Sequence, residues 1–143
     1  MTALTENRST PQKALGDRAG LLGASQSIFQ GALLMRNAAG HLVEGATATG
    51  SVGVGRAEEA VTSTTAGMTS QRFREGVFRY ANSAAGDLIA TADIGTVCYI
   101  VDDQTVAKTS ATATRSPAGI VEDVDANGVW VRFDEALTRA LLS

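Results

Sequence analysis

Few side chains in this sequence have the chemistry of a catalyst. The chain contains a single histidine, His41, and a single cysteine, Cys98. Most catalytic triads and most histidine-based metal sites need more than an isolated histidine after a turn, and His41 directly follows the turn predicted at residues 37–40. Cys98 stands inside the apolar run 97–101, where a buried and unreactive thiol is expected. We therefore predict that the protein is not an enzyme and has no catalytic residues.

A pair of glycines is the second feature with possible chemistry. Gly53-Val54-Gly55 matches the start of a dinucleotide-binding fingerprint, in which glycines let the backbone approach a pyrophosphate. The next glycine of that pattern is replaced by Glu58, and no helix with an N-terminal anion site is evident. The alternation of valine with small residues instead favours a strand at a closely packed position. No cofactor is expected.

Carboxylates are the third feature, because hard cations bind carboxylate oxygens. They are grouped in Asp102-Asp103, in Glu122-Asp123-Asp125 and in Glu58-Glu59. Asp102, Asp103 and Asp125 also stand at predicted hairpin turns, where aspartate is favoured for hydrogen bonds to the local backbone. The Glu58-Glu59 pair is expected to be solvated. We therefore predict no metal site.

The charge of the chain argues against nucleic acid as a partner. The net charge is −3 and the isoelectric point is about 5.1. The densest basic group, Arg72, Arg74 and Arg79, has Glu75 among its members, so a solvated strand face is expected rather than a phosphate-binding patch. No signal peptide pattern opens the chain, and no apolar stretch approaches the roughly 18 residues of a membrane helix. We expect a soluble protein that is made in a cytoplasm and has no membrane partner.

The first residues differ from the rest of the chain. Residues 1 to about 25 contain Pro11, mixed charges and glycines at 16, 20 and 23, and they show no convincing period. They predict an extended N-terminal arm over residues 1–25, followed by a single folded domain over residues 26–143.

Short apolar runs separated by turn signals dominate the domain. Strands are predicted over 28–35, from 41, over 51–55, 72–80 with a possible bulge at Gly76, 96–101, 105–108, 118–124 and 129–133. Their spacing of about 8–12 residues, without alternating helices, predicts an all-β barrel or sandwich. Asn127-Gly128 predicts a tight hairpin with positive φ at both residues. Mostly buried positions are expected at Val97, Tyr99, Val101, Val129, Val131 and Phe133.

The chain ends with a helical pattern. Asp134 is a suitable N-cap for a short helix ending near residue 142, and Glu135 is favoured in its first turn. So short a helix is not stable alone in water. Leu137, Leu141 and Leu142 are therefore expected to dock on the domain or on a neighbouring chain.

Several segments together show a family resemblance over about residues 28–133. Glu75-Gly76-Val77-Phe78 resembles a segment of small proteins that are encoded beside the major capsid gene of tailed bacteriophages and prophages. Three further segments are similar to that family in order and spacing: 101–106, 115–121, and 123–125 followed by 128–132.

The resemblance implies a capsid decoration (cement) protein, a structural virion protein on the outer surface of the phage head. Its fold would be a small β-barrel or β-tulip, its partner the major capsid protein, and its own oligomer a trimer. The N-terminal arms of such proteins commonly reach neighbouring subunits. Two alternatives stay open: a tail or head-tail connector component, and a small β-barrel that binds a ligand in its mouth.

Overall fold

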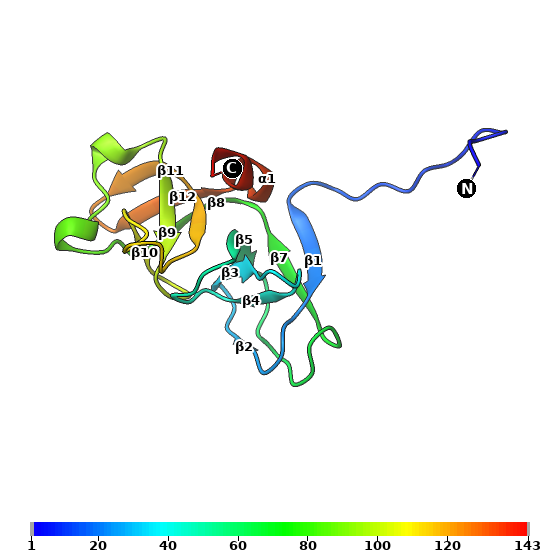
Figure 1. The fold of residues 1–143 in the computed structure, drawn as a ribbon, viewed down its shortest axis with the longest axis horizontal. Coiled ribbons are helices and arrows are strands. Elements are labelled where there is room, and N and C mark those ends of the chain that lie inside the picture. The colour runs from blue at the N-terminus through cyan, green and yellow to red at the C-terminus, as the bar shows by residue number, and fades with distance from the viewer. Residues whose placement is uncertain (1, 143) are drawn as a thin grey trace.

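The computed structural model describes residues 2–142, and these residues form an all-β fold with one short helix (Figure 1), which confirms the predicted fold class. Two five-stranded sheets, both antiparallel, make up the body. In spatial order, the first sheet contains β1 (Asp17–Leu21), β7 (Ser70–Arg74), β5 (Val52–Ala57), β3 (Leu33–Arg36) and β4 (Leu42–Glu44). The second contains β10 (Val106–Ala107), β9 (Val97–Ile100), β11 (Pro117–Asp125), β12 (Gly128–Phe133) and β8 (Gly76–Tyr80). A ribbon of β2 (Ser27–Ile28) and β6 (Val61–Thr62), two 3₁₀ turns (Ala85–Asp87 and Thr91–Asp93) and the helix α1 (Glu135–Leu141) complete the fold.

The predicted barrel is wrong, because neither sheet closes on itself. The outer strands of the first sheet meet only through an isolated bridge between Leu22 and Leu42, and those of the second only between Ala81 and Thr105. Residues 72–80 were predicted as one strand with a possible bulge at Gly76. The chain instead changes sheet at Glu75, so β7 lies in the first sheet and β8 in the second.

Strand β3 links the two sheets through its side chains. Leu34 packs into the core of the first sheet, whereas Leu33 and Met35 pack into the core of the second. Successive side chains of a strand point to opposite faces. A continuous apolar strand therefore separates two cores, and its lack of polar alternation reflects burial on both faces.

The inner face of β12 follows the prediction, but that of β9 does not. Val129, Val131 and Phe133 are buried, which confirms the expected face. In β9 the buried residues are Cys98 and Ile100, whereas Val97, Tyr99 and, just after the strand, Val101 are half-buried. The run from 97 to 101 is apolar at every position, so its pattern could not distinguish the two faces.

The hairpin between β11 and β12 also differs from its prediction. Asp125 pairs with Gly128, so the two central loop residues are Ala126 and Asn127, neither of which has a positive φ. Gly128 is the first residue of β12, with φ of 153°. Its positive φ is the half of the prediction that is confirmed, and this backbone conformation itself favours glycine; a Cβ there would also lie 2.4 Å from the carbonyl oxygen of Tyr80.

Helix α1 is capped as predicted but docks through other residues. The Asp134 side chain accepts a hydrogen bond from the backbone N–H of Leu137. The buried residue of the helix is Thr138, and Glu135 forms an ion pair with Arg36 of β3 at 3.0 Å. The three leucines at 137, 141 and 142 are 36%, 54% and 47% exposed, so they are not buried on the domain, and docking on a neighbouring chain stays a prediction.

The two sheets approach each other closely at Gly53. A Cβ at Gly53 of β5 would lie 2.2 Å from the carbonyl oxygen of Ala118 in β11. Only a glycine permits that approach. The glycine-rich run at residues 51–55 is thus a closely packed strand, as predicted.

Candidate interaction surfaces

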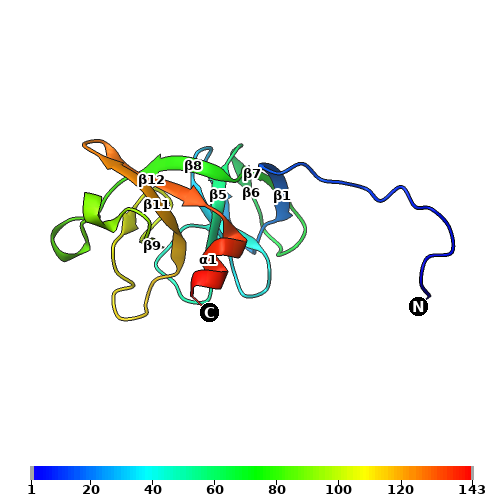
Figure 2. The same cartoon turned by 90° about the horizontal axis from the view of Figure 1, so that it is seen from above.

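An extended N-terminal segment is the most prominent surface feature. Residues 2–15 are exposed and run away from the body in both views (Figure 1 and Figure 2). The segment joins the body at Gly16, whose carbonyl oxygen accepts a hydrogen bond from the backbone N–H of Glu75 at 2.9 Å. Leu4 and Leu15 are 72% and 96% exposed, so the segment presents apolar side chains without burying them.

The predicted end of this arm at about residue 25 is wrong. All five residues of β1 pair with β7, from Asp17 opposite Arg74 to Leu21 opposite Ser70. Leu22 is completely buried in the first core. The glycines at 16, 20 and 23 suggested an irregular segment, but strand pairing with a distant part of the chain overrides local propensity. The arm therefore consists of residues up to Gly16.

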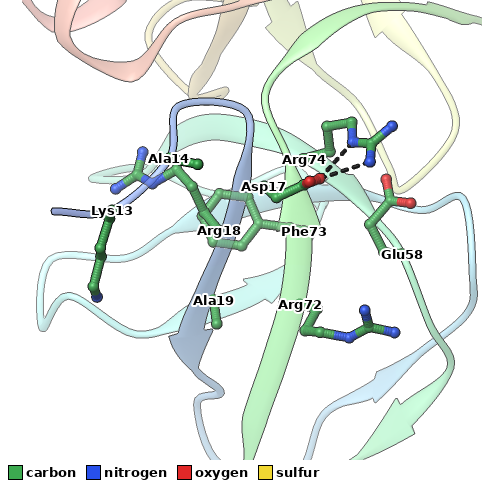
Figure 3. Close-up of a pocket in the computed structure, with 9 residues that line it drawn as sticks. All are labelled: Lys13, Ala14, Asp17, Arg18, Ala19, Glu58, Arg72, Phe73 and Arg74. Atoms are coloured by element: carbon green, nitrogen blue, oxygen red, sulfur yellow. Dashed lines mark hydrogen bonds and ion pairs between the residues drawn. The ribbon is translucent and has the colours of Figure 1, made fainter.

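A hollow of about 510 Å³ lies at the root of the arm, on the face formed by β1 and β7 (Figure 3). Its lining residues are Lys13, Ala14, Asp17, Arg18, Ala19, Glu58, Arg72, Phe73 and Arg74. Phe73 lies at its base, and the Arg18 guanidinium stands 5.4 Å from the centre of that ring. This is a favourable cation–π position.

Most of the positive charge in this hollow is already paired. Arg74 binds Asp17 at 2.7 Å, and this hydrogen bond raises the pKa of Arg74 above its usual value. Arg18 pairs with Glu75, and Arg72 lies 3.4 Å from Glu59. The arrangement is suited to a mixed-charge protein contact, because paired guanidiniums offer little net field to a free anion.

Glu58 and Glu59 are more ordered than predicted. Glu58 accepts a hydrogen bond from the Arg56 guanidinium at 2.8 Å, and Glu59 is the partner of Arg72. Neither carboxylate is simply solvated. The Arg56–Glu58 pair is local, whereas the Arg72–Glu59 contact arises because β5 and β7 are neighbours in the sheet, which the spacing along the chain did not indicate.

The single cysteine and the single histidine differ in their exposure to solvent. Cys98 is completely buried, and this burial raises the pKa of its thiol to about 12. The thiol is therefore protonated and inert at neutral pH, as predicted. His41 is half-buried beside Gly67.

The turn aspartates act on the local backbone. Asp102 accepts a hydrogen bond from the N–H of Gln104 at 2.9 Å. Asp125 accepts one from the N–H of Asn127 and another from the indole N–H of Trp130, both at 2.8 Å. These bonds lower the pKa of Asp125, the indole bond being the larger cause. Within residues 2–142 no group of three or more histidine, cysteine or acidic side chains is placed to hold a metal ion.

Two arginine–aromatic contacts were missed by sequence reasoning. Arg56 of β5 lies 4.2 Å from the ring centre of Phe78, and Arg79 lies 5.6 Å from that of Trp130. Arg79 and Trp130 are directly opposite each other on β8 and β12. Without knowing that these strands pair, the sequence offered no signal for either contact.

Comparisons of the chain with protein-family models, with curated proteins and with solved structures found no match. In the described part of the chain no helix is long and apolar enough to span a membrane.

Proposed function

We propose that the protein is a structural virion protein that decorates the outer surface of a tailed-phage head. In this proposal it binds the major capsid protein and ties neighbouring capsid subunits together, as a trimer. The support from the sequence is the resemblance of residues 28–133 to decoration proteins. The single structural observation that favours it is the arm, in which residues 2–15 are exposed and leave the body (Figure 2).

The arm has the reach to contact a neighbouring subunit. Fifteen extended residues span about 50 Å. Ordering such a segment costs about 1–2 kcal/mol per residue in backbone entropy, so it is ordered only where contacts offset that cost. Leu4 and Leu15 are the arm's exposed apolar side chains and are candidates for those contacts.

Symmetry would multiply modest contacts. A decoration protein binds many equivalent positions on a shell, and a trimer would engage several subunits at once. Each arm can therefore bind weakly while the shell as a whole becomes much more stable.

The test is cosedimentation with undecorated shells assembled from the major capsid protein of the same genome. The full chain is compared with a variant lacking residues 2–13 and with one whose residues 2–13 are replaced by glycine and serine. We expect the full chain to sediment with the shells and both variants to lose at least about tenfold in affinity.

The outcomes separate the parts of the proposal. Failure of the full chain to bind any such shell would refute decoration and favour the tail or connector alternative. Equal binding by the truncated variant would make the arm a passive leader. Analytical ultracentrifugation of the free protein tests the trimer separately.

A further inference from the structure

The outer edge of β8 is held open in strand conformation. β8 pairs with β12 on one side, and no strand within residues 2–142 covers its other side. Both flanking residues are fixed: the N–H of Glu75 donates to Gly16, and that of Ala81 donates to Gln104 at 2.8 Å. In an edge strand, alternate residues direct their N–H and C=O groups outward. Val77 and Arg79, which are in phase with Glu75 and Ala81, therefore present their backbone N–H and C=O groups outward.

This edge lacks the protection that the other edges have. β10 is two residues long, and the N–H of Val106 is bound to Ala81. At β4 the N–H of Glu44 is bound by the Gln26 side chain, and β1 carries the adjacent charges of Asp17 and Arg18. β8 contains no proline or lysine and a single charged residue, Arg79, and its valine, phenylalanine and tyrosine favour strands.

A hollow of about 440 Å³ follows this edge and includes side chains from both faces of β8. Its lining residues are Gly31, Arg56, Val77, Phe78, Arg79, Tyr80 and Trp130. Val77 and Arg79 lie on the outer face, while Phe78 and Tyr80 lie on the inner face, where the Tyr80 hydroxyl donates to Gly31. A strand that paired with β8 here would contact Val77 and Arg79 on one face and Phe78 and Tyr80 on the other.

The charged side chains beside the edge of β8 indicate which kind of ligand would bind there. Arg79 stands over Trp130 and makes no ion pair with any described residue, and Arg56 stands over Phe78 on the other face. Glu58 already binds the Arg56 guanidinium at 2.8 Å, whereas the nearby Asp125 carboxylate interacts with Arg79 through charge alone, without an ion pair. Arginine binds carboxylates strongly and with defined geometry. Arg79, on the outer face, is therefore the guanidinium left for a ligand, and the edge is complementary to an extended segment whose carboxylates alternate and so all lie on that outer face.

We infer that the free edge of β8 is a strand-addition site for an extended acidic segment of a partner polypeptide. A second copy of β8 would add another Arg79 and Arg56 to the same hollow. The arm of a second copy carries Glu6 but also Arg8 on the same face of an extended chain. A different polypeptide therefore fits better. The inference depends on β8 and its flanking arginines, not on capsid binding.

Trp130 is the only tryptophan of the chain, so its fluorescence reports on this hollow directly. The probe is a capped seven-residue peptide of alternating glutamate and valine. Two matched peptides serve as controls: one with lysine in place of glutamate, and the acidic peptide N-methylated at alternate backbone positions. We expect saturable binding of the acidic peptide and at least about tenfold weaker binding of both controls, because strand addition needs both backbone bonds and charge.

Two protein variants locate the site. Arg79→Gln is expected to weaken binding about fivefold, whereas Arg72→Gln, which removes the same charge outside the hollow, stays within about twofold. Thermal unfolding verifies that both variants are folded. Absence of saturable binding by the acidic peptide overturns the inference. Equal binding by either control peptide, or equal weakening by the two variants, also overturns it.

Discussion

The two sheets are alike in strand number and pairing but differ in what fills them. The second core contains an aromatic cluster, in which the Phe133 ring lies 5.9 Å from Tyr80, edge to face, and 6.2 Å from Phe78. Phe73 is the single aromatic side chain in the first core, and β1 at the edge of that sheet is largely exposed. The second sheet thus concentrates apolar packing, while the first carries the arm and its ion-paired root.

The sheets nevertheless depend on one another. β3 supplies side chains to both cores, and α1 packs against β5 of the first sheet and β11 of the second. A single cooperative unfolding transition is therefore expected, with the difference between the sheets visible in the size of mutational effects.

The largest effect is expected in the aromatic cluster. Phe133→Ala should lower the free energy of unfolding by about 3–5 kcal/mol, through the cavity and the lost ring contacts. Phe73→Ala should fall at the lower end of that range, because Phe73 has no aromatic neighbour in its core. Urea unfolding measures both, with the exposed Phe29→Ala as control. A larger loss from Phe73→Ala would reverse the ranking of the two cores.

The contact between the sheets is tested at Gly53. Gly53→Ala should destabilise by about 1–3 kcal/mol, because the new methyl group must displace the Ala118 backbone. Gly86→Ala is the matched control, since nothing lies within 4 Å of a Cβ there, and should cost no more than about 0.5 kcal/mol. Equal chemical denaturation midpoints for the two variants would contradict the close approach.

A smaller loss of stability is expected from a substitution in the cap of α1, the helix that packs on both sheets. Asp134→Ala should cost about 1 kcal/mol, because the N–H of Leu137 loses its acceptor. Asp134→Asn keeps an acceptor oxygen and should retain most of the stability. Thermal unfolding followed by circular dichroism compares them. Equal losses of stability in the two variants would show that the negative charge of Asp134, rather than its capping hydrogen bond, stabilises the helix.

The smallest effect is expected from the arm. Removing residues 2–13 should change the free energy of unfolding by less than about 0.5 kcal/mol, because these residues are exposed. Removing residues 2–24 should be strongly destabilising, since it deletes β1 and the buried Leu22. Comparable stability of the two truncated forms would place β1 outside the folded body.

The local sequence pattern predicted a strand, cap or buried position correctly where the residues of that segment carried a clear signal of their own. The runs that became β9, β11 and β12, the Asp134 cap and the buried Cys98 were all found from the residues alone. The arm was recognised, but its end was misplaced. β1 has only a weak local signal, and it is a strand because β7 is beside it.

The candidate surfaces depend on which strands end up at an edge. Arg79, Trp130 and Arg56 come from three strands, and two sheets bring them to one hollow. No spacing along the chain contains that information. The sequence could indicate arginines and aromatics, but not their contact.

The sequence by itself determined that the protein is an all-β chain with an arm, a capped terminal helix and an inert thiol, because alternation, capping and composition act over a few residues. Tertiary structure alone decided that β7 and β8 part at Glu75, that β3 divides two cores and that β8 has a free edge. Those features follow from pairing between residues far apart in the chain, where each strand has several possible neighbours and the packing of the whole body selects one.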